Sequence, residues 1–171
     1  MGKDGSIKVS TSFSPSADYE WLPRVGVQMR LSDSLEQVEF YGTAPPENYS
    51  DRNVGAAVGR YGSSVDDLFV PYIVPQENGN RTGTRWLTIG DGENGFKISA
   101  DQHFEFSAHR YTVDDMEGAE HLHQLERKPY VLLNIDHKQA GLGSAACGPD
   151  TLFKYRVPSM PYTWSFTIQP L

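Results

Sequence analysis

Two adjacent pairs of acidic residues, Asp66-Asp67 and Asp114-Asp115, are the first candidates for chemistry in this sequence. Hydrolysis of a glycosidic bond requires two facing carboxylates, which lie about 5–5.5 Å apart in a retaining enzyme. Adjacent side chains point away from each other, and both pairs fall at predicted helix starts or turns, where an acid caps the backbone. We therefore assign no catalytic residue to this sequence.

Histidine and cysteine also fail to form a convincing reactive group. His121 and His123 are two residues apart on a predicted helix, so their side chains would not face one metal ion. The single cysteine, Cys147, has no partner base in its local sequence, and His137 ends the preceding predicted strand. We expect Cys147 to pack as a small apolar residue, and we assign no metal ligand and no cofactor to this part of the protein.

The glycine-rich segment 90–95 matches the pattern G-x-G-x-x-G of dinucleotide-binding loops. That function requires a helix directly after the loop. Here the alternating segment 96–99 predicts a strand instead, so the sequence favours a β-hairpin loop over a nucleotide site.

Two polar loops, 41–52 and 75–81, are rich in Pro, Asn, Glu and Arg. Charge-assisted pairs of Glu47 with Arg52 and of Glu77 with Arg81 would lock them internally. A second interpretation is that they contact another domain. The residues that would then form the interface are Glu47, Asn48, Arg52, Glu77, Asn78 and Arg81.

The elements that must position these loops are mostly strands. Short runs of alternating, β-branched or aromatic residues are separated by Gly, Pro, Asn and Asp. The sequence predicts one helix over about 113–124, starting with a capping box from Thr112 to Asp115, and a helical turn at 64–68. Many short strands with one helix indicate an all-β antiparallel sandwich. The predicted strands are 25–31, 38–41, 85–89, 96–99, 103–107, 130–135, 153–157 and 162–168.

Composition excludes several classes of protein. The chain has 171 residues and a net charge of −7, and no cluster of Lys and Arg forms a phosphate-binding surface, so we expect no nucleic-acid partner. No apolar run is long enough for a membrane helix, and the N-terminus has no apolar core of a signal peptide. A single cysteine fits a reducing compartment, so we expect a cytoplasmic protein.

Several unusual strings occur in an order and spacing that resemble one enzyme family. They are Leu22-Pro-Arg-Val-Gly-Val27, the loops 41–52 and 75–81, Asn134-Ile-Asp-His137, and Gly141-Leu-Gly143 followed by Cys147-Gly-Pro149. Together they resemble the C-terminal domain, or small chain, of large β-galactosidases of the lacZ type. The resemblance implies a supersandwich fold, similar to galactose mutarotase, of which residues 1–171 would be a single domain truncated at its N-terminal side. Strand edges would then be exposed, and we expect self-association into an oligomer.

The resemblance also implies a function. The full enzyme would hydrolyse terminal β-D-galactosides such as lactose with retention, using two glutamates and bound Mg and Na in a catalytic barrel that this chain lacks. The chain would partner that barrel or a separate large subunit and would be inactive alone. In the family, the loop matching 141–149 reaches the mouth of the active site. Ser144, Ala146 and Cys147 would thus lie near the substrate, with Cys147 where some members place a sugar-stacking tryptophan.

Two alternatives stay open. One is a carbohydrate-binding or mutarotase-like module, which would need a histidine base and a carboxylate in one concave site. His103, His109 and His137 are the candidates, although their spacing defines no pair. The other is a purely structural interaction domain.

Overall fold

A computed structural model describes residues 2, 4–143 and 148–171, and it confirms an all-β, antiparallel fold. The short helices are α1 (Val65–Leu68) and α2 (Val113–Gly118), with 3-10 turns η1 (Leu122–Gln124) and η2 (Phe153–Tyr155). The strands are β1 (Ile7–Phe13), β2 (Trp21–Leu22), β3 (Arg24–Ser32), β4 (Gln37–Ala44), β5 (Ala57–Ser64), β6 (Arg81–Gly90), β7 (Gly95–His109), β8 (Tyr130–Gln139), β9 (Val157–Pro158) and β10 (Tyr162–Pro170).

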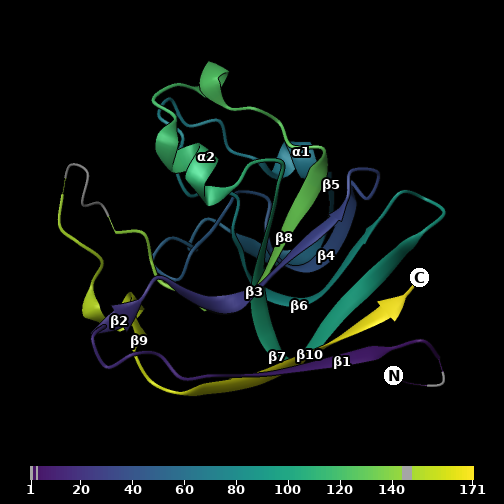
Figure 1. The fold of residues 1–171 in the computed structure, drawn as a ribbon, viewed down its shortest axis with the longest axis horizontal. Helices are drawn as coiled ribbons and strands as arrows, with labels where there is room; N and C mark the ends of the chain where they lie inside the picture. Colours follow the sequence, from purple (N-terminus) through teal and green to yellow (C-terminus); the bar gives the residue numbers. More distant parts are fainter. Residues whose placement is uncertain (1, 3, 144–147) are drawn as a thin grey trace.

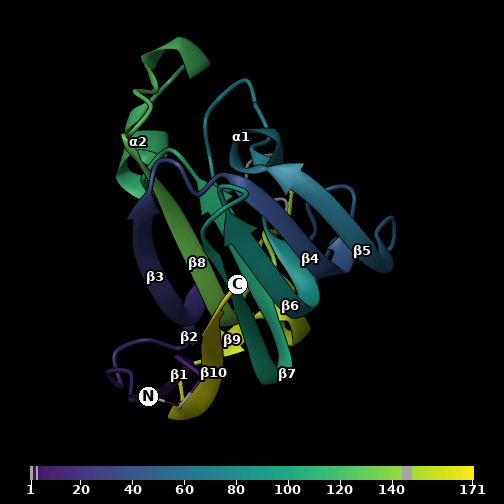
Figure 2. The same cartoon turned by 90° about the vertical axis from the view of Figure 1, so that its right-hand side faces the viewer.

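One eight-stranded sheet holds most of these strands, in the order β1-β10-β7-β6-β4-β5, while β8 joins it through β7 and carries β3 on its other side. The sheet is strongly twisted, so β1 and β10 lie across the lower end of the molecule in Figure 1, while β3 and β8 rise steeply above them. Figure 2, turned by 90°, shows the strands from β3 and β8 to β4 and β5 side by side. β2 and β9 form a separate two-stranded ribbon.

The main hydrophobic core lies on the inner face of the curved sheet and is formed by residues of β4, β6, β7, β8, β10 and α1. Val38, Phe40 and Ala44 alternate inward along β4, as a strand with one covered face requires. The Phe40 ring meets the Phe106 ring of β7 edge-on, with the centroids 4.9 Å apart. On β8 every residue from 131 to 136 is buried, which confirms the prediction of a strand covered on both faces.

The predicted hairpin at 90–95 is confirmed, because Gly90 of β6 pairs with Gly95 of β7. The alternation in 25–31 is confirmed in β3, whose Val27, Met29 and Leu31 pack on the core. The helical turn at 64–68 is α1, and the Ser64 hydroxyl caps it by accepting from the Asp67 amide.

Three predicted elements differ from the structure. The helix expected over 113–124 ends at Gly118 and is followed by the separate turn η1, because Gly118 weakens helical propensity there. Segments 96–99 and 103–107 are parts of one long strand, β7. Segment 153–157 is the 3-10 turn η2 followed by the start of β9, since Phe153 is exposed and no neighbouring strand pairs with residues 153–155 among the described residues.

Among the described residues, β1, β3 and β5 each pair along one edge only, so three edges of the large sheet stay open. In the same part of the chain, no helix is long and apolar enough to cross a bilayer.

Candidate functional site

The loop 44–53 is held from within by the amide of Asn48, which is buried. Its Nδ2 donates to the carbonyls of Thr43, at 2.8 Å, and of Pro46, at 3.0 Å. Its Oδ1 accepts from the backbone amide of Thr82 at 2.9 Å. Asn48 therefore ties its loop to the first residues of β6, which is the structural interpretation of this polar string.

Glu47 connects the same loop to the segment before β6. Its carboxylate accepts from the Arg52 guanidinium at 2.6 Å, which confirms the predicted pair, and from the backbone amide of Gly79 at 2.6 Å. The Tyr72 hydroxyl donates to the same carboxylate. The two polar loops thus form one unit.

The predicted pair of Glu77 with Arg81 is wrong. Arg81 is buried and donates to the carbonyls of Gly79 and Asn80, at 2.9 and 3.1 Å. Gly79 takes a φ of +77°, a turn that brings these carbonyls back under the guanidinium of Arg81. Glu77 instead contacts Arg24, with an Nη2–Oε1 distance of 3.5 Å.

Asn78, the remaining predicted interface residue, is also buried. Its Oδ1 accepts from the Val70 amide at 3.0 Å, and its carbonyl lies 3.0 Å from Nε2 of His109. Burial lowers the pKa of His109 to about 4, so this imidazole is neutral and serves as a structural hydrogen-bonding group.

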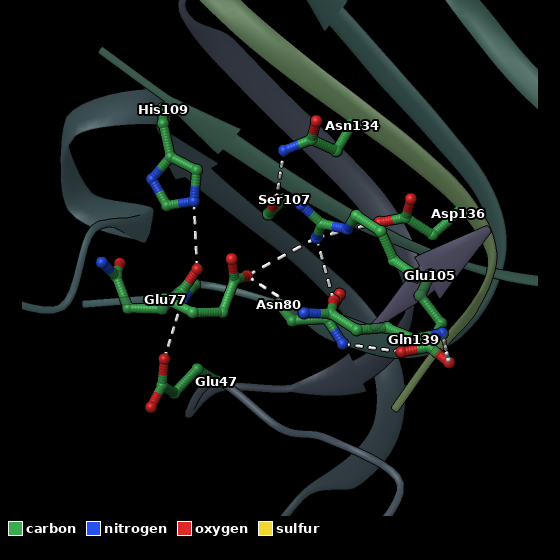
Figure 3. A network of polar contacts seen from close by, with 12 residues as sticks. Glu47, Glu77, Asn80, Glu105, Ser107, His109, Asn134, Asp136 and Gln139 are labelled. Carbon is green, nitrogen blue, oxygen red and sulfur yellow. Dashed lines mark hydrogen bonds and ion pairs between the residues drawn. The ribbon is translucent and has the colours of Figure 1, made fainter. Parts of the chain in front are cut away.

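Arg24 is the centre of a larger polar network that connects β3, β7 and β8. Figure 3 shows the network, with Glu77, Glu105 and Asp136 labelled. Its Nη2 lies 3.1 Å from Oδ2 of Asp136 and donates to Oε1 of Gln139 at 3.0 Å. Gln139 in turn donates to Glu77 at 3.1 Å. One guanidinium therefore joins the start of β3 to the end of β8.

Glu105 and Asp136 face each other across the β7–β8 ladder in this network. Burial raises the pKa of Asp136 to about 7, because the loss of solvent outweighs the attraction of Arg24, and burial raises the pKa of Glu105 in the same sense. Raised carboxyl pKa values are typical of catalytic sites. The Asp136 side chain is only 2% exposed and is paired with Arg24, however, while the two oxygens of Glu105 accept from Asn80 and Gln139, so we assign both carboxyl groups structural roles.

The register of β3 on β8 joins two of the strings that carry the family resemblance, Leu22–Val27 and Asn134–His137. Gly26 lies opposite Asp136, and a side chain at Gly26 would collide with the Asp136 carboxylate. In the first string, Arg24 neutralises the Asp136 carboxylate, and Gly26 leaves room for it. One feature of the sequence could have predicted this contact, namely Asp136, an acid that directly follows the apolar run of β8. A buried carboxylate requires a partner cation, which here is Arg24.

Asp51 fixes the start of the loop 141–149. Its carboxylate accepts from the backbone amides of Leu142, at 3.2 Å, and of Gly143, at 2.8 Å. A Cβ on Gly141 would lie 2.5 Å from Cγ of Asp51, so only glycine allows this approach. The far end of the loop is held by Arg156, which contacts Asp150 at 3.0 Å.

The predicted substrate-contacting residues Ser144, Ala146 and Cys147 lie outside the described residues. Beside the described base of the loop is a cleft of about 400 Å³, whose lining includes Trp21, Arg24, Glu77, Gln139 and Leu142. The predicted interface residue Glu77 and the base of the predicted substrate loop therefore line the same cleft.

The other candidates for chemistry have structural roles. Asp66 pairs with Arg110, at 3.4 Å, while Asp115 closes the predicted capping box by accepting from the Thr112 amide at 2.8 Å. His121 and His123 do stack, with centroids 5.5 Å apart, because this segment is not α-helical. In the described part of the chain, no three His, Cys, Asp or Glu residues are placed to hold a metal ion.

Comparison with known proteins identifies the family. The family model described as beta galactosidase small chain matches residues 1–168. The β-galactosidase of Priestia megaterium is 33% identical over 98% of this chain, and that of Streptococcus thermophilus is also 33% identical over 98%. The β-galactosidase of Pectobacterium atrosepticum is 39% identical over 71% of the chain.

The chain spans only 16% of the length of the Priestia protein and 17% of that of the Streptococcus protein. It corresponds to one domain of such an enzyme. With its all-β fold and a match across nearly its whole length, the chain belongs to the β-galactosidase small-chain family.

Proposed function

We propose that this chain is the C-terminal part of a β-galactosidase that hydrolyses terminal β-D-galactosides such as lactose. The observation that carries the proposal is the family match over residues 1–168 together with relatives named as β-galactosidases. The two catalytic glutamates would lie in a barrel domain or large subunit outside these 171 residues, with Mg and Na bound there. We retain a cytoplasmic location as part of this proposal.

The role we propose for the chain is to shape the mouth of the active site with the loop 141–149. The anchoring of the loop base supports the role, since Asp51 from a distant loop holds Leu142 and Gly143, and Arg156 binds Asp150 directly after the loop. Small residues on a loop with an anchored base can approach a neighbouring surface closely, which is useful for positioning a substrate. Ser144, Ala146 and Cys147 would be the residues nearest the sugar.

The polar loops would form the adjoining contact with the barrel. Their carboxylates and amides are largely consumed by internal hydrogen bonds, so we propose that the loops act as a rigid surface rather than as a set of free charges. Arg52 is the member with the most exposed side chain, 51%, and is therefore the best candidate for a direct contact.

Steady-state kinetics on a reassembled enzyme test this role. A barrel-bearing fragment would be assayed alone, with the chain, and with a Gly141→Ala chain, using lactose and a galactoside with a small leaving group. We expect the variant to raise KM for lactose more than for the small galactoside, because the mouth contacts the second sugar. Equal effects on both substrates would contradict the role of the loop but not membership in the enzyme.

A further inference from the structure

The longest strand, β7, changes partner halfway along its length. Its first half pairs with β10 as far as Ala100, opposite Phe166, and its second half pairs with β8 from Glu105, opposite Asp136. Residues 101–104 lie between these two ladders and have no partner on that side. Because β7 exchanges β10 for β8 here, a hollow lies at the fork, near the middle of β7.

This hollow has a volume of about 290 Å³ and is lined by residues of four strands, β1, β7, β8 and β10. β7 contributes Asp101, Gln102 and His103, β8 contributes His137, and β10 contributes Trp164. The volume is at the lower end of the range of small-molecule sites, which suits a single sugar ring. Two of the three histidines left open by the sequence, His103 and His137, therefore line the same hollow.

The polar groups of the hollow are available for a ligand. Within the described part of the chain, the side chains of Asp101, Gln102 and His103 form no hydrogen bond or ion pair, and all three are exposed. Each of these side chains can donate to or accept from a hydroxyl group. The hydroxyls of Ser10 and Ser165 add two further groups of the same kind.

An aromatic surface stands beside these groups. The His137 ring stacks on Trp164, with centroids 5.8 Å apart and an angle of 24° between the planes. Burial lowers the pKa of His137, so its imidazole is neutral at neutral pH and can both donate and accept. The two rings cover each other in part and both stay half-buried, so it is their exposed portions that would contact the apolar face of a pyranose, beside the hydroxyl, amide and carboxylate groups.

The charge of the hollow favours a neutral ligand. Lys8 and Asp101 are the charged residues in its lining, and their charges cancel. A phosphate or another anion would need a cationic excess, which this lining lacks. We propose that the fork between β8 and β10 is a binding site for a neutral monosaccharide unit, either free or at the end of an oligosaccharide. The site uses none of the residues of the loop 141–149, so it is independent of the role proposed for that loop.

Titration of the 171-residue chain by NMR tests the proposal, using the ring C–H signals of His103 and His137 as reporters. Galactose, lactose, glycerol and inorganic phosphate would be added separately. We expect galactose to shift both signals with a Kd on the order of 1 mM, while phosphate and glycerol have no saturable effect. Lactose binding as tightly as galactose would indicate that a terminal sugar is accepted, and weaker lactose binding would indicate a site for the free monosaccharide.

Variants separate binding from folding. Asp101→Asn and His103→Ala alter exposed side chains without structural partners, so we expect each to weaken galactose binding about tenfold while the thermal unfolding temperature stays unchanged. His121→Ala removes another exposed imidazole, stacked on His123, and should leave binding intact. Saturable binding of phosphate in place of galactose, or no shift with any sugar, would overturn the proposal, as would galactose binding that survives both variants.

Discussion

Replacement of Asp51 by Ala should release the base of the loop 141–149 without unfolding the sheet. The Asp51 carboxylate holds the amides of Leu142 and Gly143, at 3.2 and 2.8 Å, although these residues are 91 and 92 positions away in the sequence. Asp51 lies in a loop outside the buried core, so its loss removes these two hydrogen bonds and leaves the strand ladders in place.

The magnitude follows from the two hydrogen bonds. A hydrogen bond to a charged group contributes about 1.5–3 kcal/mol. Asp51 is half-buried and one of its two distances is long, so we take about 2 kcal/mol for the pair together. Since about 1.4 kcal/mol corresponds to a factor of ten, local opening should become about 30-fold more frequent.

Hydrogen exchange of single backbone amides measures this opening directly. In Asp51→Ala, the amides of Leu142, Gly143 and Gly141 should exchange about 30-fold faster, while amides of β8 should be unchanged. Gly141 is a useful reporter because its own acceptor, the Tyr155 carbonyl at 2.9 Å, is untouched.

Asp91 provides a matched control. Its carboxylate also accepts from two backbone amides, those of Glu93 and Asn94, at 3.0 and 2.7 Å, but in the hairpin between β6 and β7. Asp91→Ala should accelerate exchange in that hairpin and leave Gly141 unchanged. Unchanged exchange at Gly141 and Gly143 in Asp51→Ala would refute the reasoning, because the loop would then be held by something else.

Three further predictions follow from other contacts. The pKa of Asp136 is raised to about 7, so the folded state keeps a proton that the unfolded state has released, and stability should fall as the pH rises from about 4 to 7. Chemical denaturation across this range should show that the free energy of unfolding of the wild type falls by up to about 4 kcal/mol relative to that of Asp136→Asn. The same dependence of the free energy of unfolding on pH in both proteins would contradict this prediction. Gly141→Ala should lower the unfolding temperature, measured by circular dichroism, but should do so much less when combined with Asp51→Ala, which removes the clash. Thr112→Ala should cost about 1 kcal/mol by loss of the α2 cap, measured by urea unfolding, and Thr112→Ser should restore most of it.

The elements best predicted from the sequence are those whose signals are local. The continuous apolar run of β8, the alternation in β3 and the hairpin at 90–95 depend on neighbouring residues, and the structure confirms all three. The join of 96–99 and 103–107 into one strand was not predictable in the same way. The intervening Asp101 and Gln102 are polar and look like a loop in the sequence. They lie where β7 changes from β10 to β8 as its partner, and that change depends on the arrangement of the whole sheet.

The contacts that organise the candidate site were harder to predict because they connect distant positions. Glu47 and Arg52 are close in the sequence, and their pair was predicted correctly. Arg24 is far in sequence from both Asp136 and Glu77, and no local pattern predicts either contact. Sequence proximity therefore favours the pair of Glu77 with Arg81, which the structure does not contain. Asp51 has no sequence feature that distinguishes it from other acids in loops, and its contact with the Gly143 amide arises only in the folded chain.

The most direct test of the account is hydrolysis of a chromogenic β-galactoside by the chain alone and by the chain titrated into a barrel-bearing fragment that lacks it. We predict no hydrolysis by the chain alone, and activity on mixing that rises with the chain and saturates at one equivalent. Activity of the chain alone would contradict the claim that it carries no catalytic carboxylate pair. Stable association with the fragment, shown by size-exclusion chromatography, without any gain in activity would contradict the claim that the chain completes a β-galactosidase.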